Sequence, residues 1–204
     1  MPVRSHLARL RLSEVFNTSR LCAQSRHTQI GVTAVTTANQ HAIVAGQSVT
    51  IRPMHSSDSA MEEEFVRNLS IETKHYRFLG GVKELLPAEL RLLCNVDGQH
   101  TMAFVATVEK DGHETQIGVS RYAEGSKENV REMAVTVADE WQHKGLGGLL
   151  SKRLIEYAGS HGVKQLYSVD LADNSAMRHL ANELGMSARP NADEPNQVIY
   201  SLRL

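Results

Sequence analysis

Residues 133–148 read MAVTVADEWQHKGLGG, a run in which an apolar, β-branched segment passes into a glycine-rich turn. The segment 133–137 predicts a strand, because β-branched and apolar residues favour extended structure. Gly145, Gly147 and Gly148 then leave the backbone bare where the next helix is expected to begin. Free N–H groups and the positive end of a helix dipole meet at such a point. The run therefore predicts a strand–loop–helix unit that binds an anion.

Two familiar phosphate-binding motifs do not fit this loop. A nucleoside triphosphate loop needs Gly-Lys followed by Ser or Thr, whereas Lys144 precedes the first glycine. A dinucleotide loop needs a third glycine where Leu150 stands, and no first βαβ unit surrounds it. Both ligand classes are therefore disfavoured.

Residue patterns on either side of the loop predict the other elements. A helix over 147–160 is expected, because its apolar residues recur at the i, i+3, i+4 spacing of one helix face. Asp111-Gly112 is a strong hairpin signal and predicts that the strands flanking it pair antiparallel. Further strands are expected over 49–52, 102–109, 115–123, 166–171 and 198–202, and further helices over 59–68, 70–78, 87–94 and 175–184, with a break at Gly80-Gly81. This order predicts an α+β fold, a mixed sheet with helices on its faces.

Composition changes near residue 48 and divides the chain in two. Residues 1–48 hold five arginines against one acid, Glu14, and show neither helical nor strand periodicity beyond a short helix expected near 7–16. We expect a loosely ordered arm, either a solvated tail or a start codon assigned too far upstream; such N-termini also occur in organelle transit peptides. Residues 49–204 are expected to form one domain around a single core.

Overall charge and composition exclude several classes of partner. Lys and Arg number 22 against 23 Asp and Glu, which gives a net charge of −1, so nucleic acid and anionic membrane surfaces are disfavoured. Cys22 and Cys94 make no disulfide framework, and neither the cysteines nor the ten histidines show metal-ligand spacing, so no metal is expected. The longest nearly apolar run, 102–108, is far shorter than the roughly 20 residues that cross a bilayer. A cytoplasmic location is expected.

The pattern Gln142-x-x-Gly145-x-Gly147 after a strand resembles the acetyl-CoA diphosphate loop of the GNAT acetyltransferases, which reads Gln or Arg, two residues, Gly, one residue, and Gly or Ala. In that superfamily a strand and a helix bearing an Asn come next, as 166–171 and Asn174 do here. The segments LSIETKHYRF at 69–78 and AVTVADEWQ at 134–142 resemble the bacterial protein-lysine acetyltransferase branch. The resemblance covers 49–204 and implies a mixed, mostly antiparallel, twisted sheet flanked by helices, with acetyl-CoA as co-substrate.

The resemblance also implies roles for individual residues. A lysine amine has a pKa of about 10.4 and is protonated at neutral pH, so its attack on a thioester needs a base. Glu132 matches the position of the family's catalytic glutamate, and a backbone N–H of Val135 or Val137 is expected to stabilise the oxyanion. The pantetheine arm is expected to pair with this strand where it splays from its neighbour. The implied cofactor-binding residues are Val135, Val137, Gln142, His143, Lys144, Gly145, Leu146, Gly147, Gly148 and Asn174.

The usual general acid of the superfamily has no counterpart in the sequence. Many members place a Tyr four residues before the Gly that ends the last helix, where this chain has Ala181. Tyr167, Tyr200 or water are the alternatives for protonating the leaving thiolate. Asn174 has a second interpretation, as an ordinary N-cap of the helix that begins at Ser175.

The acceptor is a primary amine, and the resemblance favours a protein lysine. Glutamates of the 57–94 segment, above all Glu62, Glu63 and Glu64, are expected to attract a cation, although an acidic run is more often a solvated helix face. A small amine is the nearest alternative. An alternative from a different functional class is a protein that senses acyl-CoA by binding it, with little turnover. The missing Tyr favours this alternative. The protein is expected to be a monomer or a homodimer.

Overall fold

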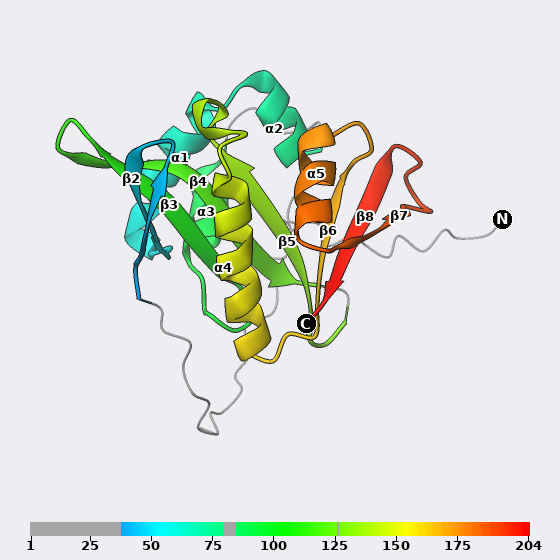
Figure 1. The fold of residues 1–204 in the computed structure, drawn as a ribbon. Coiled ribbons are helices and arrows are strands. Elements are labelled where there is room, and N and C mark those ends of the chain that lie inside the picture. Colours follow the sequence, from blue (N-terminus) through cyan, green and yellow to red (C-terminus); the bar gives the residue numbers. More distant parts are fainter. Residues whose placement is uncertain (1–37, 80–84, 126) are drawn as a thin grey trace, which may run out of the picture.

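The computed structural model describes residues 38–79, 85–125 and 127–204 (Figure 1). Within them, strands form one eight-stranded sheet in the order β1-β2-β3-β4-β5-β6-β8-β7. The strands are β1 Gln40–Val44, β2 Gln47–Pro53, β3 Met102–Lys110, β4 His113–Glu124, β5 Val130–Val137, β6 Gln165–Leu171, β7 Ser187–Pro190 and β8 Gln197–Arg203. Among these described strands, β5–β6 is the only parallel pair. The predicted α+β fold with a mixed, mostly antiparallel sheet is confirmed.

Helices cover both faces of this sheet. Figure 1 shows α4 and α5 in front of it and α1 and α3 behind it. Successive side chains of β3 point to opposite faces of the sheet. Phe104 packs with side chains of α4 and α5, and Val105 packs with side chains of α1 and α3. The elements are α1 Ser59–Asn68, α2 Ile71–Arg77, α3 Pro87–Cys94, α4 Leu146–Ser160 and α5 Ser175–Glu183, with short 3-10 turns η2 Ser56–Asp58 and η3 Asp139–Trp141.

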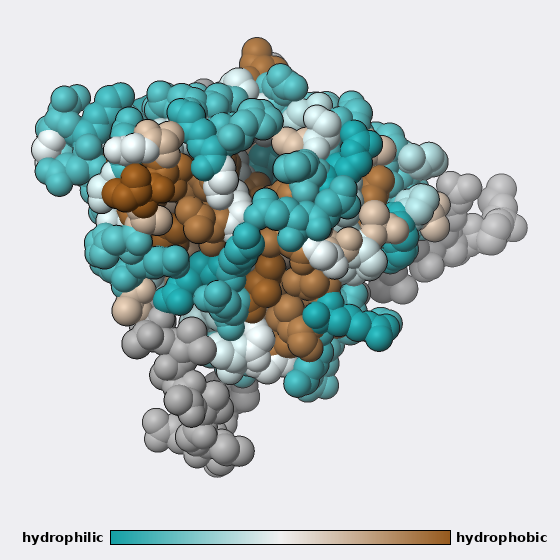
Figure 2. Space-filling model, in the orientation of Figure 1, coloured by the Kyte–Doolittle hydropathy of each residue, from teal (hydrophilic) through white to brown (hydrophobic). Residues whose placement is uncertain are grey.

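Helix α4 crosses the front of the sheet with its apolar side chains turned inward. Leu150 and Leu154 are fully buried, as the predicted stripe requires. Figure 2 shows that hydrophilic side chains cover most of this side of the molecule, with hydrophobic surface confined to a few patches. Within the described residues, no helix is both long enough and apolar enough to cross a membrane.

The predicted hairpin between β3 and β4 is present. Asp111 and Gly112 have φ angles of 53° and 76°, and Lys110 pairs directly with His113 across them. Positive φ at both central residues is the conformation for which Asp-Gly is favoured, because its twist matches that of the strands.

Three expectations need correction. The sheet begins at β1, before the boundary predicted at residue 48, because β1 pairs along β2 and places Val44, 3% exposed, in the core. Strand β5 begins at Val130, ahead of the predicted 133, and β7 was not expected at all. Residues 1–37 of the arm expected over 1–48, its helix at 7–16 and the break at Gly80-Gly81 lie outside the described residues.

The parallel pair β5–β6 is short and opens the sheet. Residues pair only at Val130–Gln165, Arg131–Leu166 and Glu132–Tyr167. Beyond them β5 runs on to Val137, paired with β4 alone, while β6 runs on to Leu171, paired with β8. The two strands therefore separate, and the separation positions the site described next.

Candidate active site

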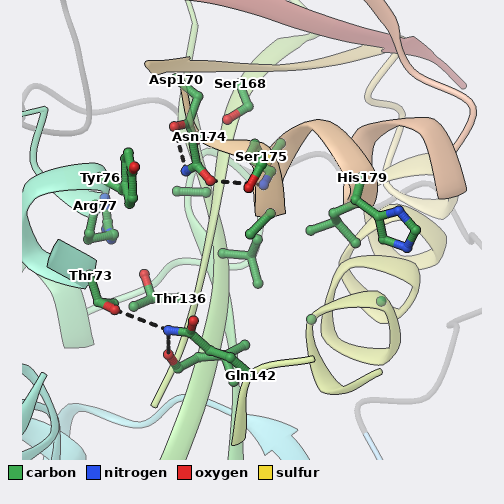
Figure 3. Close-up of a pocket in the computed structure, with 18 of the residues that line it drawn as sticks. Thr73, Tyr76, Arg77, Thr136, Gln142, Ser168, Asp170, Asn174, Ser175 and His179 are labelled. Carbon is green, nitrogen blue, oxygen red and sulfur yellow. Dashed lines mark hydrogen bonds between the residues drawn. The ribbon is translucent and has the colours of Figure 1, made fainter. Parts of the chain in front are cut away.

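A cleft of about 730 Å³ lies where β5 and β6 separate (Figure 3). Its walls come from β5, β6, the glycine loop, α2, the first turn of α4 and the length of α5. This volume is typical of small-molecule sites. The predicted site residues that line it are Glu132, Val135, Val137, Gln142, His143, Gly145, Gly147, Gly148 and Asn174.

The N-terminus of α4 faces this cleft without a side-chain cap. Gly145 is the N-cap residue, and no side chain of the described residues accepts a hydrogen bond there. His143 and Gly145 have φ angles of 58° and 81°, so the loop twice enters the left-handed region. A Cβ at Gly145 would meet nothing within 4 Å, so backbone conformation rather than space favours glycine. The uncapped first turn presents N–H groups suited to an anion.

Two loop residues contribute less than the resemblance implies. The Leu146 side chain is 1% exposed and packs in the core, so only its backbone can face a ligand. Lys144 does not line the cleft, and its Nζ lies 5.5 Å from the centroid of the Trp141 ring. Trp141 is itself 5% exposed and anchors the loop in the same core.

The free edge of β5 presents backbone groups to the cleft. Gly125 N donates to Val130 O at 3.1 Å, and Ala138 N donates to Ile117 O at 2.9 Å, so alternate residues of β5 face β4. The peptide groups of Met133, Val135 and Val137 must then face the opposite edge, where β6 has moved away. Val137 O is already used, because it accepts from Gln142 Nε2 at 3.2 Å.

Glu132 lies at the end of the parallel pairing and in the cleft wall. Its residue is 7% exposed, and Tyr167 Oη donates to Glu132 Oε2 at 3.4 Å. Burial raises the pKa of Tyr167 above its ordinary value, and the Glu132 charge and hydrogen bond raise it further. Tyr167 therefore retains its proton and acts as a donor to Glu132, which makes it a poor general acid. Tyr200 packs in the core at 3% exposed and does not line the cleft.

Asn174 caps α5, as its second interpretation predicts. Its Oδ1 accepts from Met177 N at 3.0 Å, and its Nδ2 donates to Asp170 Oδ1 at 2.8 Å. Burial raises the pKa of Asp170 to about 6, although the hydrogen bonds from Asn174 and the backbone of Leu171 act in the opposite direction. Asn174 and Asp170 both line the cleft.

The cleft wall on the α2 side is charged. Arg77, the last residue of α2, is half-buried, and burial together with the Arg121 charge lowers its pKa to about 10. Glu132 and Asp170 counteract this shift, so a cation and two carboxylates share the region. Glu62, expected to attract an acceptor, is instead buried at 2% exposed in an ion pair with Arg121.

Comparison with known proteins identifies the family. The model of the acetyltransferase (GNAT) family matches residues 63–186. The chain belongs to this family. An acetyltransferase of Pseudomonas aeruginosa is 45% identical over 159 residues, covering 78% of this chain and 86% of that protein. Acetyltransferase Pat of Mycolicibacterium smegmatis is 31% identical over 141 residues, which cover 69% of this chain but 41% of that longer protein.

Solved structures confirm the GNAT fold. The GNAT domain of S. lividans PAT superposes with a TM-score of 0.73 at 19% identity, covering 81% of this chain and 97% of that domain. A cAMP-binding acyltransferase from Mycobacterium smegmatis gives a TM-score of 0.54 at 27% identity, covering 81% of this chain and 47% of that one. The resemblance found in the sequence is thus confirmed at the level of family and fold.

GNAT enzymes use acetyl-CoA, and the cleft of this GNAT acetyltransferase suits that ligand. The uncapped α4 N-terminus matches an anionic diphosphate. Thr136 Oγ1, in the cleft wall, is buried without a hydrogen-bond partner among the described residues, as expected of a group that a polar ligand would satisfy. Within the same residues, no three His, Cys, Asp or Glu side chains gather in a way that could hold a metal ion.

Sequence reasoning missed five residues of the cleft wall. Thr73, Arg77, Thr136, Ser168 and Asp170 all line it. Thr73 and Arg77 belong to the 69–78 segment, and its resemblance to the protein-lysine acetyltransferases was the one signal that could have pointed to them. Ser168 and Asp170 carried none, because only the separation of β6 from β5 exposes them.

Proposed function

We propose that this GNAT acetyltransferase moves an acetyl group from acetyl-CoA to a primary amine, with a protein lysine as acceptor and Glu132 as general base. One observation carries the proposal. The Glu132 carboxylate lines the same cleft as the free edge of β5 and the uncapped N-terminus of α4. A base, backbone donors and an anion site therefore meet in one cavity.

Glu132 would remove the proton that keeps the acceptor amine unreactive. Deprotonating a lysine at pH 7 costs about 4.6 kcal/mol, since each pH unit below the pKa costs about 1.36 kcal/mol. A carboxylate placed beside the amine, directly or through one water, supplies the acceptor for that proton. Tyr167, which donates to Glu132 Oε2, would orient the carboxylate.

Backbone groups would hold the acyl donor. The N–H groups from Gly145 to Gly148 suit the diphosphate, and the free edge at Val135 suits the pantetheine amides. Thr136 Oγ1 is available as a further polar contact. The co-substrate supplies the thioester that carries the acetyl group.

A cationic acceptor is favoured by the charges of the cleft. The cleft is lined by the guanidinium of Arg77 and by five carboxylates, those of Glu72, Glu132, Asp139, Asp170 and Glu183. This excess of carboxylates favours a cationic acceptor amine, while the N–H groups at the start of α4 provide a local site for an anion. The relationship to an acetyltransferase named Pat also supports a protein lysine.

The second candidate is an acyl-CoA-binding sensor with little turnover. The observation that favours it is Ala181, fully buried in α5, which leaves no hydroxyl where many relatives place their general acid. Binding of acetyl-CoA without product would distinguish it from an enzyme.

The test is incubation of a cell lysate with the protein and isotopically labelled acetyl-CoA, followed by mass spectrometry of proteins and of small amines. We expect label on protein lysines with the wild type and far less with Glu132→Gln. Label confined to small amines would contradict the lysine acceptor. No label anywhere, together with heat of acetyl-CoA binding in calorimetry, would favour the sensor.

A further inference from the structure

Three segments of the chain meet at the side chain of Gln142. Its Nε2 donates to Thr73 Oγ1 of α2 at 3.0 Å and to Val137 O at the end of β5 at 3.2 Å (Figure 3). Thr73 Oγ1 in turn donates to Asp139 Oδ1 at 2.6 Å. A helix, a strand end and the glycine loop are therefore joined through one amide and one hydroxyl.

The chemistry of these groups fixes the direction of every hydrogen bond. A carboxylate and a carbonyl only accept, so the Thr73 proton goes to Asp139 and the hydroxyl oxygen faces Gln142. Both neighbours of the Gln142 amide then require a donor, which assigns its nitrogen to this side. Hydrogen bonds from Ser70 and Thr73 lower the pKa of Asp139, outweighing the opposite effect of burial, so Asp139 is charged near neutral pH. A charged acceptor strengthens the Thr73 bond.

This arrangement changes the role of Gln142 within its motif. Both amide hydrogens are donated inside the protein, so the amide nitrogen acts on the loop rather than on a ligand. On the core side, Trp141 and Leu146 hold the loop, at 5% and 1% exposed. On the α2 side, Thr73 bonds both to Asp139 of η3 and to Gln142. Gln142 is the nearer of the two to the turn at His143 and Gly145, where φ is positive.

We propose that Thr73 is a positioning residue for acetyl-CoA: its hydroxyl holds Gln142, and through Gln142 it holds the loop whose N–H groups take the diphosphate. The proposal rests on the proposed function, because it assigns the diphosphate to this loop. The Thr73–Gln142 hydrogen bond thereby connects helix α2 to the loop that would bind the diphosphate.

The first test uses the protein without ligand. Hydrogen exchange of the 142–148 amides is measured in the wild type, Thr73→Val, which keeps the shape but loses the hydroxyl, and Thr73→Ser, which restores it. Ser70→Ala cannot serve as the control, because Ser70 Oγ hydrogen-bonds to Thr73 Oγ1 at 3.1 Å and to Asp139. The control on the same helix is Lys74→Met, since the Lys74 ammonium donates to Arg67 O at 2.8 Å and hydrogen-bonds to neither the Thr73 hydroxyl nor Gln142. We expect faster exchange in Thr73→Val alone.

The second test measures acetyl-CoA affinity by calorimetry in the same set. Losing one such hydrogen bond should weaken binding by about three- to tenfold in Thr73→Val, with little change in Thr73→Ser or Lys74→Met. In a Gln142→Leu background the Thr73→Val effect should vanish, because Thr73 acts through Gln142.

Three results would overturn the proposal. Unchanged loop exchange in Thr73→Val would mean that the hydroxyl does not hold the loop. Faster exchange with unaltered affinity, or an equal loss of affinity in Lys74→Met, would mean that Thr73 merely stabilises α2. A wild-type protein that binds no acetyl-CoA would contradict the proposed function instead, and the exchange data would still decide whether Thr73 holds the loop.

Discussion

The Glu132 side chain lies in the cleft wall with Tyr167 as its hydrogen-bond donor. Glu132→Gln keeps the size of the side chain but cannot take a proton from an amine. We expect kcat to fall by about 10²- to 10⁴-fold while the Kd for acetyl-CoA stays nearly unchanged, because the base acts on the acceptor. Steady-state kinetics and calorimetry on one preparation measure both quantities.

Glu140→Gln is the control, because it also removes one negative charge from the protein. Glu140 is an exposed residue of η3 that does not line the cleft, so its substitution should leave kcat intact. Equal turnover of Glu132→Gln and the wild type across neutral pH would show that another group is the base.

At the scale of elements, a buried ion pair docks α1 on the sheet. Glu62 of α1 pairs with Arg121 of β4, and Gln116 Nε2 donates to Glu62 Oε2 at 2.6 Å. Glu62→Gln would leave Arg121, 4% exposed, as an uncompensated buried charge. We expect a loss of about 3–5 kcal/mol in the free energy of unfolding, measured in urea.

Two comparisons separate this effect from loss of surface charge. Glu63→Gln, on the exposed side of the same helix, should change stability by less than about 0.5 kcal/mol. The double variant Glu62→Leu with Arg121→Met should recover most of the loss, because no unpaired charge remains. A Glu62→Gln protein as stable as Glu63→Gln would show that the pair does not hold α1.

Sequence patterns predicted elements whose cause is local. The hairpin at Asp111-Gly112 and helix α4 follow from residues adjacent in the chain. Strand β7 escaped prediction because Ser187–Pro190 is a short, exposed edge that exists only through pairing with β8. The Thr73–Gln142 contact escaped for a similar reason, since 69 residues separate its members. Patterns of neighbouring residues therefore located the glycine loop, but they did not reveal its hydrogen bond to Thr73.

At the scale of the whole molecule, one parallel pair within an otherwise antiparallel sheet creates the cleft. Strand β5 reaches β6 through the crossover helix α4, and the two strands stay paired for only three residues. The free edge of β5 and the uncapped start of α4 consequently open into the same space. Among the described residues, the sheet ends at β1 and β7, and every strand between them pairs with a neighbour on each side.

The β1 edge allows a prediction about the chain as a whole. A protein beginning at Ala38 retains β1 and the contact from Arg153 Nη2 to Ala38 O, and we expect its thermal midpoint and turnover to match the full chain. A protein beginning at Gln47 loses β1, including the buried Val44, and uncovers the edge of β2. Its thermal midpoint should fall by roughly 5–10 °C. Calorimetric scans and turnover assays on the three lengths measure this, and lower turnover of the Ala38 protein would instead give residues 1–37 a part in catalysis.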